Sequence, residues 1–365
     1  MKFKAIHKKK FSSDFWWWLL AILVNLVLSL IWFKYFFTLG KADLLASAAL
    51  SGQNIGGLPM TTSKLTDLKH IAAIDYNEAA SLWPLLSGSS VKIFKPQDGV
   101  SVTIGGKTEK LFHLDKPLAT AWVVTSDGWL VSSYDLADWS DLIAVSNDHK
   151  TRSLDKKSVD PLTGLIFYHL KGANDLTPLK LGENGWNRPG QLFYNLDGRG
   201  GFQAAWLENN NYNKKEALII NSDSLRQRWQ FSATWPHSAL FTGKGELFGI
   251  VNKEDEFVPV NYIKSGFTSL LSDNTFKRVS LGVDYIDLNQ LSLSNHYGLL
   301  IDRVIEDSPA DKAGVKAGDI LLSIDEINLD GEVSLNEILQ HYRPRSRVSL
   351  VIQRAGQNHQ LNCQF

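Results

Sequence analysis

The chain has 365 residues, of which 44% are hydrophobic and 21% charged, a composition typical of folded protein that excludes a disordered or collagen-like chain. Lysine plus arginine and aspartate plus glutamate number 38 each, so no net charge attracts the chain to nucleic acid. The single cysteine, Cys363, excludes an intrachain disulfide and a thiolate metal centre. The length predicts two folded domains with an appendage.

The N-terminal segment predicts a membrane anchor. No charged residue occurs from Phe15 to Phe33, and a helix over residues 15–37, at about 1.5 Å per residue, spans the ~30 Å hydrocarbon layer. Aromatic residues lie at both ends of this helix, as at the two membrane surfaces. The preceding tail, residues 1–14, contains five lysines and therefore indicates an N-terminus in the cytoplasm. A cleaved signal peptide is the alternative, but the apolar stretch is too long for one.

This orientation places the rest of the chain outside the cytoplasmic membrane, in the periplasm or its equivalent. Residues 38–85, which contain the breakers Gly56, Gly57 and Pro59, are expected to form a spacer with one or two helices. Over residues 86–275, short alternating apolar runs are separated by turn residues, a pattern that predicts many short strands in a sandwich or barrel.

In residues 278–365 the sequence pattern changes from short strands alone to a mixture of strands and helices. Strands are expected at 299–301, 320–324 and 348–352, with a short helix around Ala310 between the first two. A second helix is expected before the last strand, because apolar residues there follow the spacing of one helix face. Its apolar positions are Leu335, Ile338, Leu339 and Tyr342.

Three motifs in this C-terminal part, at 280–283, 304–310 and 313–321, resemble the PDZ domain of HtrA/Deg proteins. The glycine loop of such a domain cradles a peptide's terminal carboxylate, and the next strand accepts the peptide as an added strand. The resemblance assigns the carboxylate loop to Leu281, Gly282 and Val283. It assigns the wall of the side-chain pocket to Leu335, Ile338 and Leu339, although the same apolar pattern also suits plain core residues.

The middle part is similar to the trypsin-like domain that precedes a PDZ domain in the HtrA family. Short stretches match successive strands of that domain in order: 125–131, 160–163, 178–182, 189–192, 245–250 and 257–261. The expected fold is therefore mainly β, with a transmembrane helix, a trypsin-like double β-barrel over 86–275 and an α+β PDZ domain over 278–365.

The catalytic positions depart from the family pattern. The family's histidine falls on Asp135, its aspartate on Gly164 and its serine nucleophile on Pro236, which has neither a hydroxyl nor an N–H for an oxyanion. A two-residue shift of the alignment puts Ser238 at the nucleophile position as a rescue, with the base still missing. These substitutions predict a protein that is not an enzyme.

The preferred interpretation is a membrane-anchored pseudoprotease that binds peptide or protein C-termini through its PDZ domain, as an adaptor, sensor or scaffold of envelope quality control. The family resemblance implies a homotrimer or a partnership with an active HtrA-type protease. No cofactor is expected, and the nine histidines show no metal-binding spacing. The alternative is an HtrA-type serine endopeptidase with a relocated or non-standard catalytic site.

Overall fold

The structure, a computed structural model, describes residues 76–183, 188–209, 218–226, 229–291 and 297–365. The predicted basic tail, the predicted membrane helix over 15–37 and most of the predicted spacer lie outside these residues. Across the described ranges, no helix is long and apolar enough to cross a membrane. All described elements belong to one compact unit, residues 74–365.

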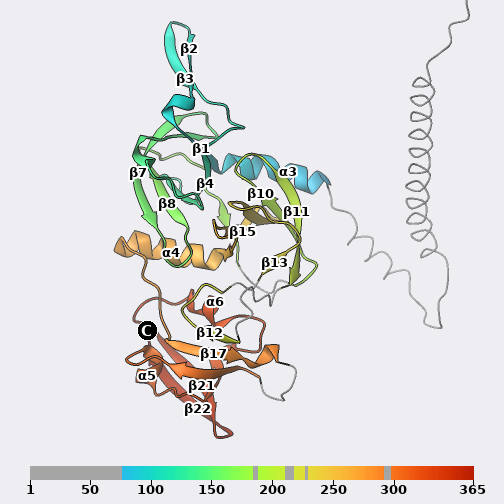
Figure 1. The fold of residues 1–365 in the computed structure, drawn as a ribbon, viewed down its shortest axis with the longest axis vertical. Coiled ribbons are helices and arrows are strands. Elements are labelled where there is room, and N and C mark those ends of the chain that lie inside the picture. Colours follow the sequence, from blue (N-terminus) through green and yellow to red (C-terminus); the bar gives the residue numbers. More distant parts are fainter. Residues whose placement is uncertain (1–75, 184–187, 210–217, 227–228, 292–296) are drawn as a thin grey trace, which may run out of the picture. The chain divides into compact units, whose positions relative to one another are not determined.

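Six strands close the first barrel, in the order β1-β4-β5-β8-β7-β6 (Figure 1). Apolar side chains such as Val91, Leu130 and Ile166 are fully buried inside it, because alternate residues of each strand face the interior. The strands are β1 (Ser90–Phe94), β4 (Ala119–Val123), β5 (Trp129–Ser132), β6 (Ile143–Ser146), β7 (Thr151–Val159) and β8 (Ile166–Leu170). Short insertions are η1 (Pro96–Asp98), the hairpin β2 (Val100–Ile104) with β3 (Lys107–Leu111), and η2 (Trp139–Asp141).

A seven-stranded sheet follows, with the main order β13-β11-β10-β14-β15-β16 and β9 paired to β15. Aromatic rings form part of its core, with the Phe193 and Phe248 centroids 4.5 Å apart. The strands are β9 (Lys180–Leu181), β10 (Leu192–Leu196), β11 (Phe202–Asn209), β13 (Gln230–Phe231), β14 (Ala239–Thr242), β15 (Glu246–Val251) and β16 (Phe257–Pro259).

The mainly β class with a closed barrel is thus confirmed, but the second half of the predicted double barrel is an open sheet among the described residues. Its edge strand β16 is short because Pro259 has no N–H for a further ladder bond, and the chain turns there into a helix.

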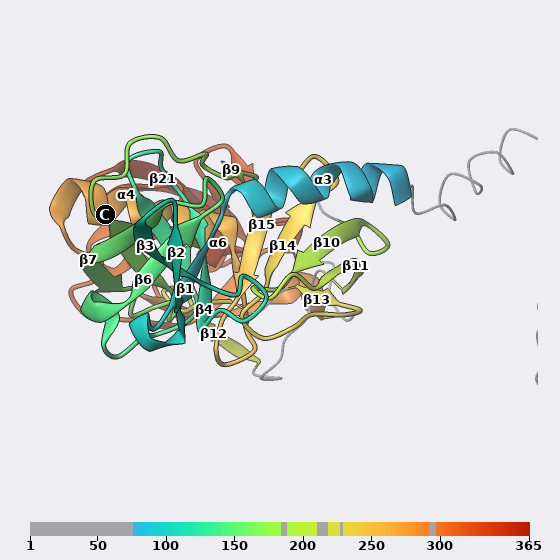
Figure 2. The same ribbon diagram turned by 90° about the horizontal axis from the view of Figure 1, so that it is seen from above.

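Two helices pack on these sheets. Helix α3 (Tyr76–Gly88) runs past β14 and β15 in Figure 2, and its Leu85 lies beside the turn at Gly245. Helix α4 (Val260–Asp273) buries Ile263, Phe267 and Leu270 in the same core that receives side chains from both sheets. It ends at Asn274, whose left-handed backbone closes the helix.

The C-terminal sheet has the order β12-β17-β18-β19-β21-β22, with β20 paired to β19. Local signals shape its helices: the Ser308 and Ser334 hydroxyls cap α5 and α6, and Gly314 ends α5 with a positive φ of 87°. The elements are β12 (Ile219–Asn221), β17 (Val283–Asp287), η3 (Leu288–Gln290), β18 (Leu299–Val304), α5 (Pro309–Ala313), β19 (Ile320–Ile324), β20 (Ile327–Asn328), α6 (Leu335–Leu339), β21 (Arg347–Arg354) and β22 (Gln357–Gln364).

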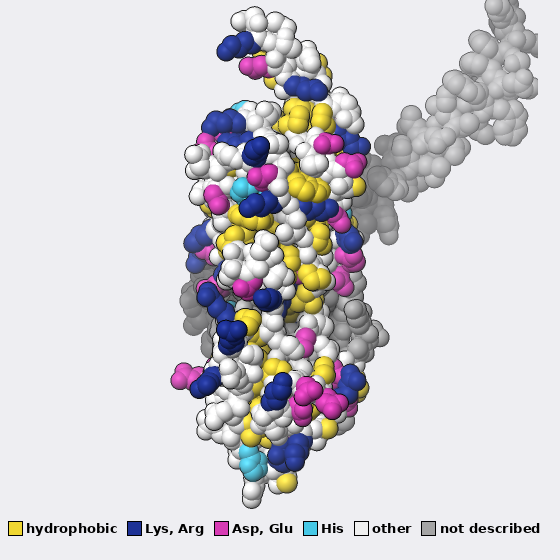
Figure 3. Space-filling view, turned by 90° about the vertical axis from the view of Figure 1, so that its left-hand side faces the viewer, with side chains coloured by type: hydrophobic (Ala, Val, Ile, Leu, Met, Phe, Trp, Pro, Cys, Tyr) yellow, Lys and Arg dark blue, Asp and Glu magenta, His cyan; other side chains and the backbone are white. Residues whose placement is uncertain are grey.

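One strand of this sheet comes from elsewhere in the chain. Strand β12 lies between β11 and β13 in sequence, yet it pairs with β17 at the edge of the C-terminal sheet (Figure 1). On the face shown in Figure 3, charged side chains of both signs are interspersed, consistent with the balanced composition.

Candidate active site and peptide groove

Two loops of the trypsin-like part bring a serine and a histidine together. Ser133 follows β5 in the loop where the family resemblance expects a histidine, and His237 precedes β14 in the loop where it expects a serine. The Ser133 Oγ lies 3.0 Å from His237 Nδ1, within hydrogen-bonding distance. A neutral imidazole with an unprotonated Nδ1 accepts the hydroxyl proton at this distance, which is the arrangement of a nucleophile and its general base.

The surroundings hold the imidazole in place. The ring of Tyr134 stacks on His237 with centroids 4.1 Å apart and an angle of 17° between the planes. His237 has a positive φ of 63°, so the loop presents its side chain from a left-handed backbone. Ser133 is buried, whereas His237 is only partly buried.

The electrostatics favour a neutral imidazole. Burial lowers the pKa of His237, and this effect outweighs a hydrogen bond to the Ser133 backbone and the charge of Glu254, both of which raise the pKa. Glu254 lies in the turn between β15 and β16. Its negative charge favours the protonated imidazole without a hydrogen bond to it among the described contacts, and its carboxylate lies 3.5 Å from Lys253 Nζ.

We expect His237 to titrate with a midpoint below 6.5, its ordinary pKa. The unfolded imidazole then binds protons at a higher pH than the folded one does. The free energy of unfolding should therefore fall as the pH falls from about 6.5 to the folded pKa, and level off below it. Burial also lowers the pKa of His341, so this second histidine destabilises the fold in the same way as the pH falls. The free energy of unfolding of His237→Gln should therefore still fall with pH, but by less than that of the wild type. NMR titration of the imidazole C–H signals measures the midpoint, with His237→Gln as the assignment control; a midpoint above 6.5 would contradict the burial argument.

The predicted triad positions occupy the same neighbourhood without forming a triad. The Asp135 carboxylate is exposed and pairs with Lys157 Nζ at 2.5 Å. Gly164 has a positive φ of 68°, and a Cβ added there would lie 3.6 Å from Glu254 Oε2, so the predicted aspartate position does border the carboxylate of Glu254. Pro236 is exposed and precedes His237 directly.

The rescue serine does not join the site. Ser238 is fully buried, and its Oγ donates a hydrogen bond of 2.5 Å to the Trp235 carbonyl. Its hydroxyl therefore closes the turn at 235–238, and the serine that contacts a histidine is Ser133.

Sequence reasoning missed the pair Ser133 and His237. The sequence did contain a signal: the loop expected to hold the histidine contains a serine, and the loop expected to hold the serine contains a histidine. The pair was missed because each loop was searched for only one residue type.

The predicted PDZ site residues lie as follows. Gly282 has a positive φ of 77°, and an added Cβ would lie 2.3 Å from Ser308 Cβ, so only glycine fits this loop. Leu281 and Val283 flank it and are buried. The predicted pocket wall, Leu335, Ile338 and Leu339, is also buried in the domain core, with each residue at most 1% exposed.

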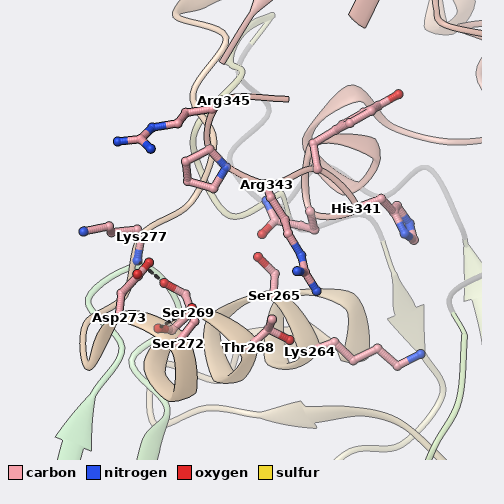
Figure 4. A pocket seen from close by; sticks show the side chains of 13 residues that line it. Lys264, Ser265, Thr268, Ser269, Ser272, Asp273, Lys277, His341, Arg343 and Arg345 are labelled. Carbon is pink, nitrogen blue, oxygen red and sulfur yellow. Dashed lines mark hydrogen bonds between the residues drawn. The ribbon is translucent and has the colours of Figure 1, made fainter. Parts of the chain in front are cut away.

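Two cavities accompany these sites. A cavity of about 530 Å³ lies between α4 and the 340–345 turn and is lined by the cationic side chains of Lys264, Lys277, Arg343 and Arg345 (Figure 4). A second, of about 300 Å³, is lined by Trp83, Trp122 and Leu196 among others, with Asp197 and Arg199. Burial raises the pKa of Tyr134, with smaller opposing effects of the Arg199 and Asp197 charges.

The fold and the sites define a trypsin-like body followed by a PDZ domain. A PDZ-domain family model matches residues 300–354. A probable periplasmic serine endoprotease DegP-like of Marinomonas sp. (strain MWYL1) is 26% identical over 259 residues, which cover 66% of this chain and 55% of that protein. One of the same description from Rickettsia conorii is 33% identical over 108 residues, which cover 28% of this chain and 20% of that protein.

Among solved structures, the HtrA-type protease AlgW with a decapeptide is 19% identical, with a TM-score of 0.48 over 80% of this chain and 98% of that one. In sequence the chain is similar to DegP-like serine endoproteases, and its C-terminal part matches a PDZ domain. It spans about half the length of the Marinomonas relative, 55%.

These relatives correct one prediction. The expectation of a protein that is not an enzyme is wrong, because the relatives that match the chain are named as serine endoproteases. That expectation rested on the residues at three aligned positions, Asp135, Gly164 and Pro236. Comparing those positions alone cannot detect a serine–histidine contact between other residues of the same loops.

Proposed function

We propose that this chain is an HtrA-type serine endopeptidase with a relocated catalytic site. The observation that carries the proposal is the 3.0 Å contact between Ser133 Oγ and His237 Nδ1 in the trypsin-like part. The lowered pKa of His237 supports it, because a base must be unprotonated to accept the hydroxyl proton near neutral pH.

The proposed reaction is hydrolysis of a peptide bond in two steps. Ser133 Oγ attacks the carbonyl carbon while its proton passes to His237, and the C–N bond breaks as His237 returns the proton to the leaving amine. Water then attacks the acyl-enzyme, with His237 taking the water proton and Ser133 leaving as the hydroxyl. Glu254 stabilises the imidazolium that exists between the proton transfers.

The remaining parts of the proposal concern placement and partners. The PDZ domain binds peptide or protein C-termini at the loop of Leu281, Gly282 and Val283. The apolar segment 15–37, predicted from the sequence to be a helix, anchors the chain in the cytoplasmic membrane with residues 38–365 outside the cytoplasm, a location supported by the periplasmic relatives. A homotrimer is the proposed assembly, in line with the family resemblance.

The catalytic site is tested by covalent labelling of the purified chain with a fluorophosphonate probe. The expected product is an adduct in which a bond between Ser133 Oγ and phosphorus replaces the bond to fluoride, located by peptide mass spectrometry. Ser133→Ala should abolish labelling. Ser238→Ala is the matched control, since it removes an equally buried hydroxyl from the neighbouring loop. Labelling that persists in Ser133→Ala, or no labelling of the wild-type chain, would contradict the relocated site.

A further inference from the structure

The peptide groove of the PDZ domain is already filled by the chain's own residues. Strand β12 pairs antiparallel with β17, with Ile219, Ile220 and Asn221 opposite Ile286, Tyr285 and Asp284. The ladder continues to Ser222, whose N–H donates to the Val283 carbonyl at 2.9 Å. This is the position and direction of a peptide that adds a strand to a sheet edge.

An acidic side chain occupies the carboxylate loop. The N–H of Leu281 donates to Asp223 Oδ1 at 3.1 Å, and the Ser280 hydroxyl donates to Asp223 Oδ2. The N–H of Val283, two residues later at the start of β17, donates to Ser222 Oγ at 3.1 Å. Asp223 therefore supplies the negative charge that a free C-terminus would supply, and Ser222 takes the place of a last residue.

Helix α6, on the opposite side of the groove, also binds this segment through hydrogen bonds. Asn336 on α6 is fully buried, and its Nδ2 donates to the Asn221 and Ser224 carbonyls at 2.8 and 2.9 Å. Its Oδ1 accepts from the Tyr285 hydroxyl on β17 at 2.7 Å, which fixes the amide. The side chain of Ile220, two residues before Ser222, packs against the PDZ core.

We propose that residues 219–223 are an internal ligand of the PDZ groove, and that an external C-terminus binds only by displacing them. The inference rests on the peptide-binding part of the proposed function. It also narrows the ligand class: an extended peptide with a free carboxylate, a small last residue like Ser222 and an apolar residue two positions earlier like Ile220. Only molecules with an open groove bind the external peptide. The apparent Kd is therefore the Kd of the open groove divided by the fraction of molecules whose groove is open.

The probe is a dye-labelled peptide that copies residues 218–222, Leu-Ile-Ile-Asn-Ser, with a free C-terminus. Its binding to the full chain is followed by fluorescence polarisation, with the amidated peptide as the ligand control. Asp223→Ala removes the two hydrogen bonds that the carboxylate loop donates to the internal ligand, together with the bond from the Ser222 hydroxyl within that ligand. The substitution leaves the loop sequence unchanged, so it should lower the Kd about tenfold or more. Asp302→Ala is the matched control. Asp302 is exposed on β18, so this substitution removes the same charge at a position away from the groove.

A reversible lock tests displacement directly. Ile219 and Ile286 are directly opposite and form a non-hydrogen-bonded pair, because the bond from Ser222 to Val283 sets the alternation. In the Ile219→Cys/Ile286→Cys variant, oxidation should form a cross-link and abolish probe binding, and reduction should restore it.

The inference is overturned if wild-type and Asp223→Ala chains bind the probe equally, if no cross-link forms, or if the oxidised variant binds as well as the reduced one. It is also overturned if Asp223→Ala fails to bind the probe, since the probe copies what the groove holds. Failure of the peptide-binding proposal looks different: Asp223→Ala would then bind no member of a library of C-terminal peptides. The endopeptidase proposal is judged separately by labelling of Ser133.

Discussion

Replacing Ser133 by alanine is expected to lower the rate of peptide hydrolysis by about 10³-fold or more, the scale of loss when a serine nucleophile is removed. The reason is that, among the described residues, the Ser133 hydroxyl is the one within hydrogen-bonding distance of the His237 imidazole, while the Ser238 hydroxyl binds the Trp235 carbonyl. His237→Ala should cost as much. The double variant should lose little more, because a nucleophile and its base act as a unit.

The measurement is cleavage of unfolded casein and of a quenched fluorescent peptide by the purified chain. Ser238→Ala should retain activity within a few-fold, and circular dichroism shows whether each variant is folded. Glu254→Gln should have a smaller effect than Ser133→Ala and should shift the acid limb of the pH–rate profile to lower pH, because the carboxylate raises the pKa of His237. Equal turnover by wild type and Ser133→Ala would refute the assignment of the nucleophile.

Arg278→Met is expected to lower the free energy of unfolding by about 3–5 kcal/mol, the usual loss when one partner of a buried ion pair is removed. Arg278 lies between α4 and β17, and its guanidinium binds the Asp160 carboxylate through two nitrogens at 2.7 and 2.6 Å. Asp160 is only 1% exposed, so the substitution leaves a carboxylate buried without its cation. Arg278 also donates to the Tyr262 carbonyl at 3.0 Å.

Urea denaturation followed by tryptophan fluorescence measures this loss. Lys277→Met is the matched control, because the neighbouring Lys277 is exposed and has no ion pair in the described part of the chain, so its change should stay within about 0.5 kcal/mol. Combining Arg278→Met with Asp160→Asn should recover part of the stability, since the unpaired charge is removed. If Arg278→Met and Lys277→Met were equally stable, the ion pair would contribute nothing net.

Much of the PDZ domain was predictable because its signals are local. Ser308 followed by Pro309 is a cap and a first helical residue, Gly314 supplies the left-handed residue that ends α5, and Gly282 supplies the positive φ of the carboxylate loop. Each of these choices depends on a few neighbouring residues, so it can be recognised in the sequence. The presence of many short strands in residues 86–275 was likewise predictable from short alternating apolar runs, although β6 and β7 were not located individually.

The amino-acid sequence was enough to indicate the resemblance to HtrA proteins and which residues stand in the loops of the expected catalytic site. Which side chains meet depends on the packing of the folded chain. Ser133 and His237 are 104 residues apart, and they are brought together by the packing of sheets whose strands pair over long distances in the chain. The internal ligand likewise contains a three-residue strand, Ile219–Asn221, that pairs with residues 284–286 of β17 and is too short to carry a periodic signal of its own. Backbone hydrogen bonds at a sheet edge accept almost any sequence, so the partner of such an edge is settled by the geometry of the fold and not by the residues of the strand alone.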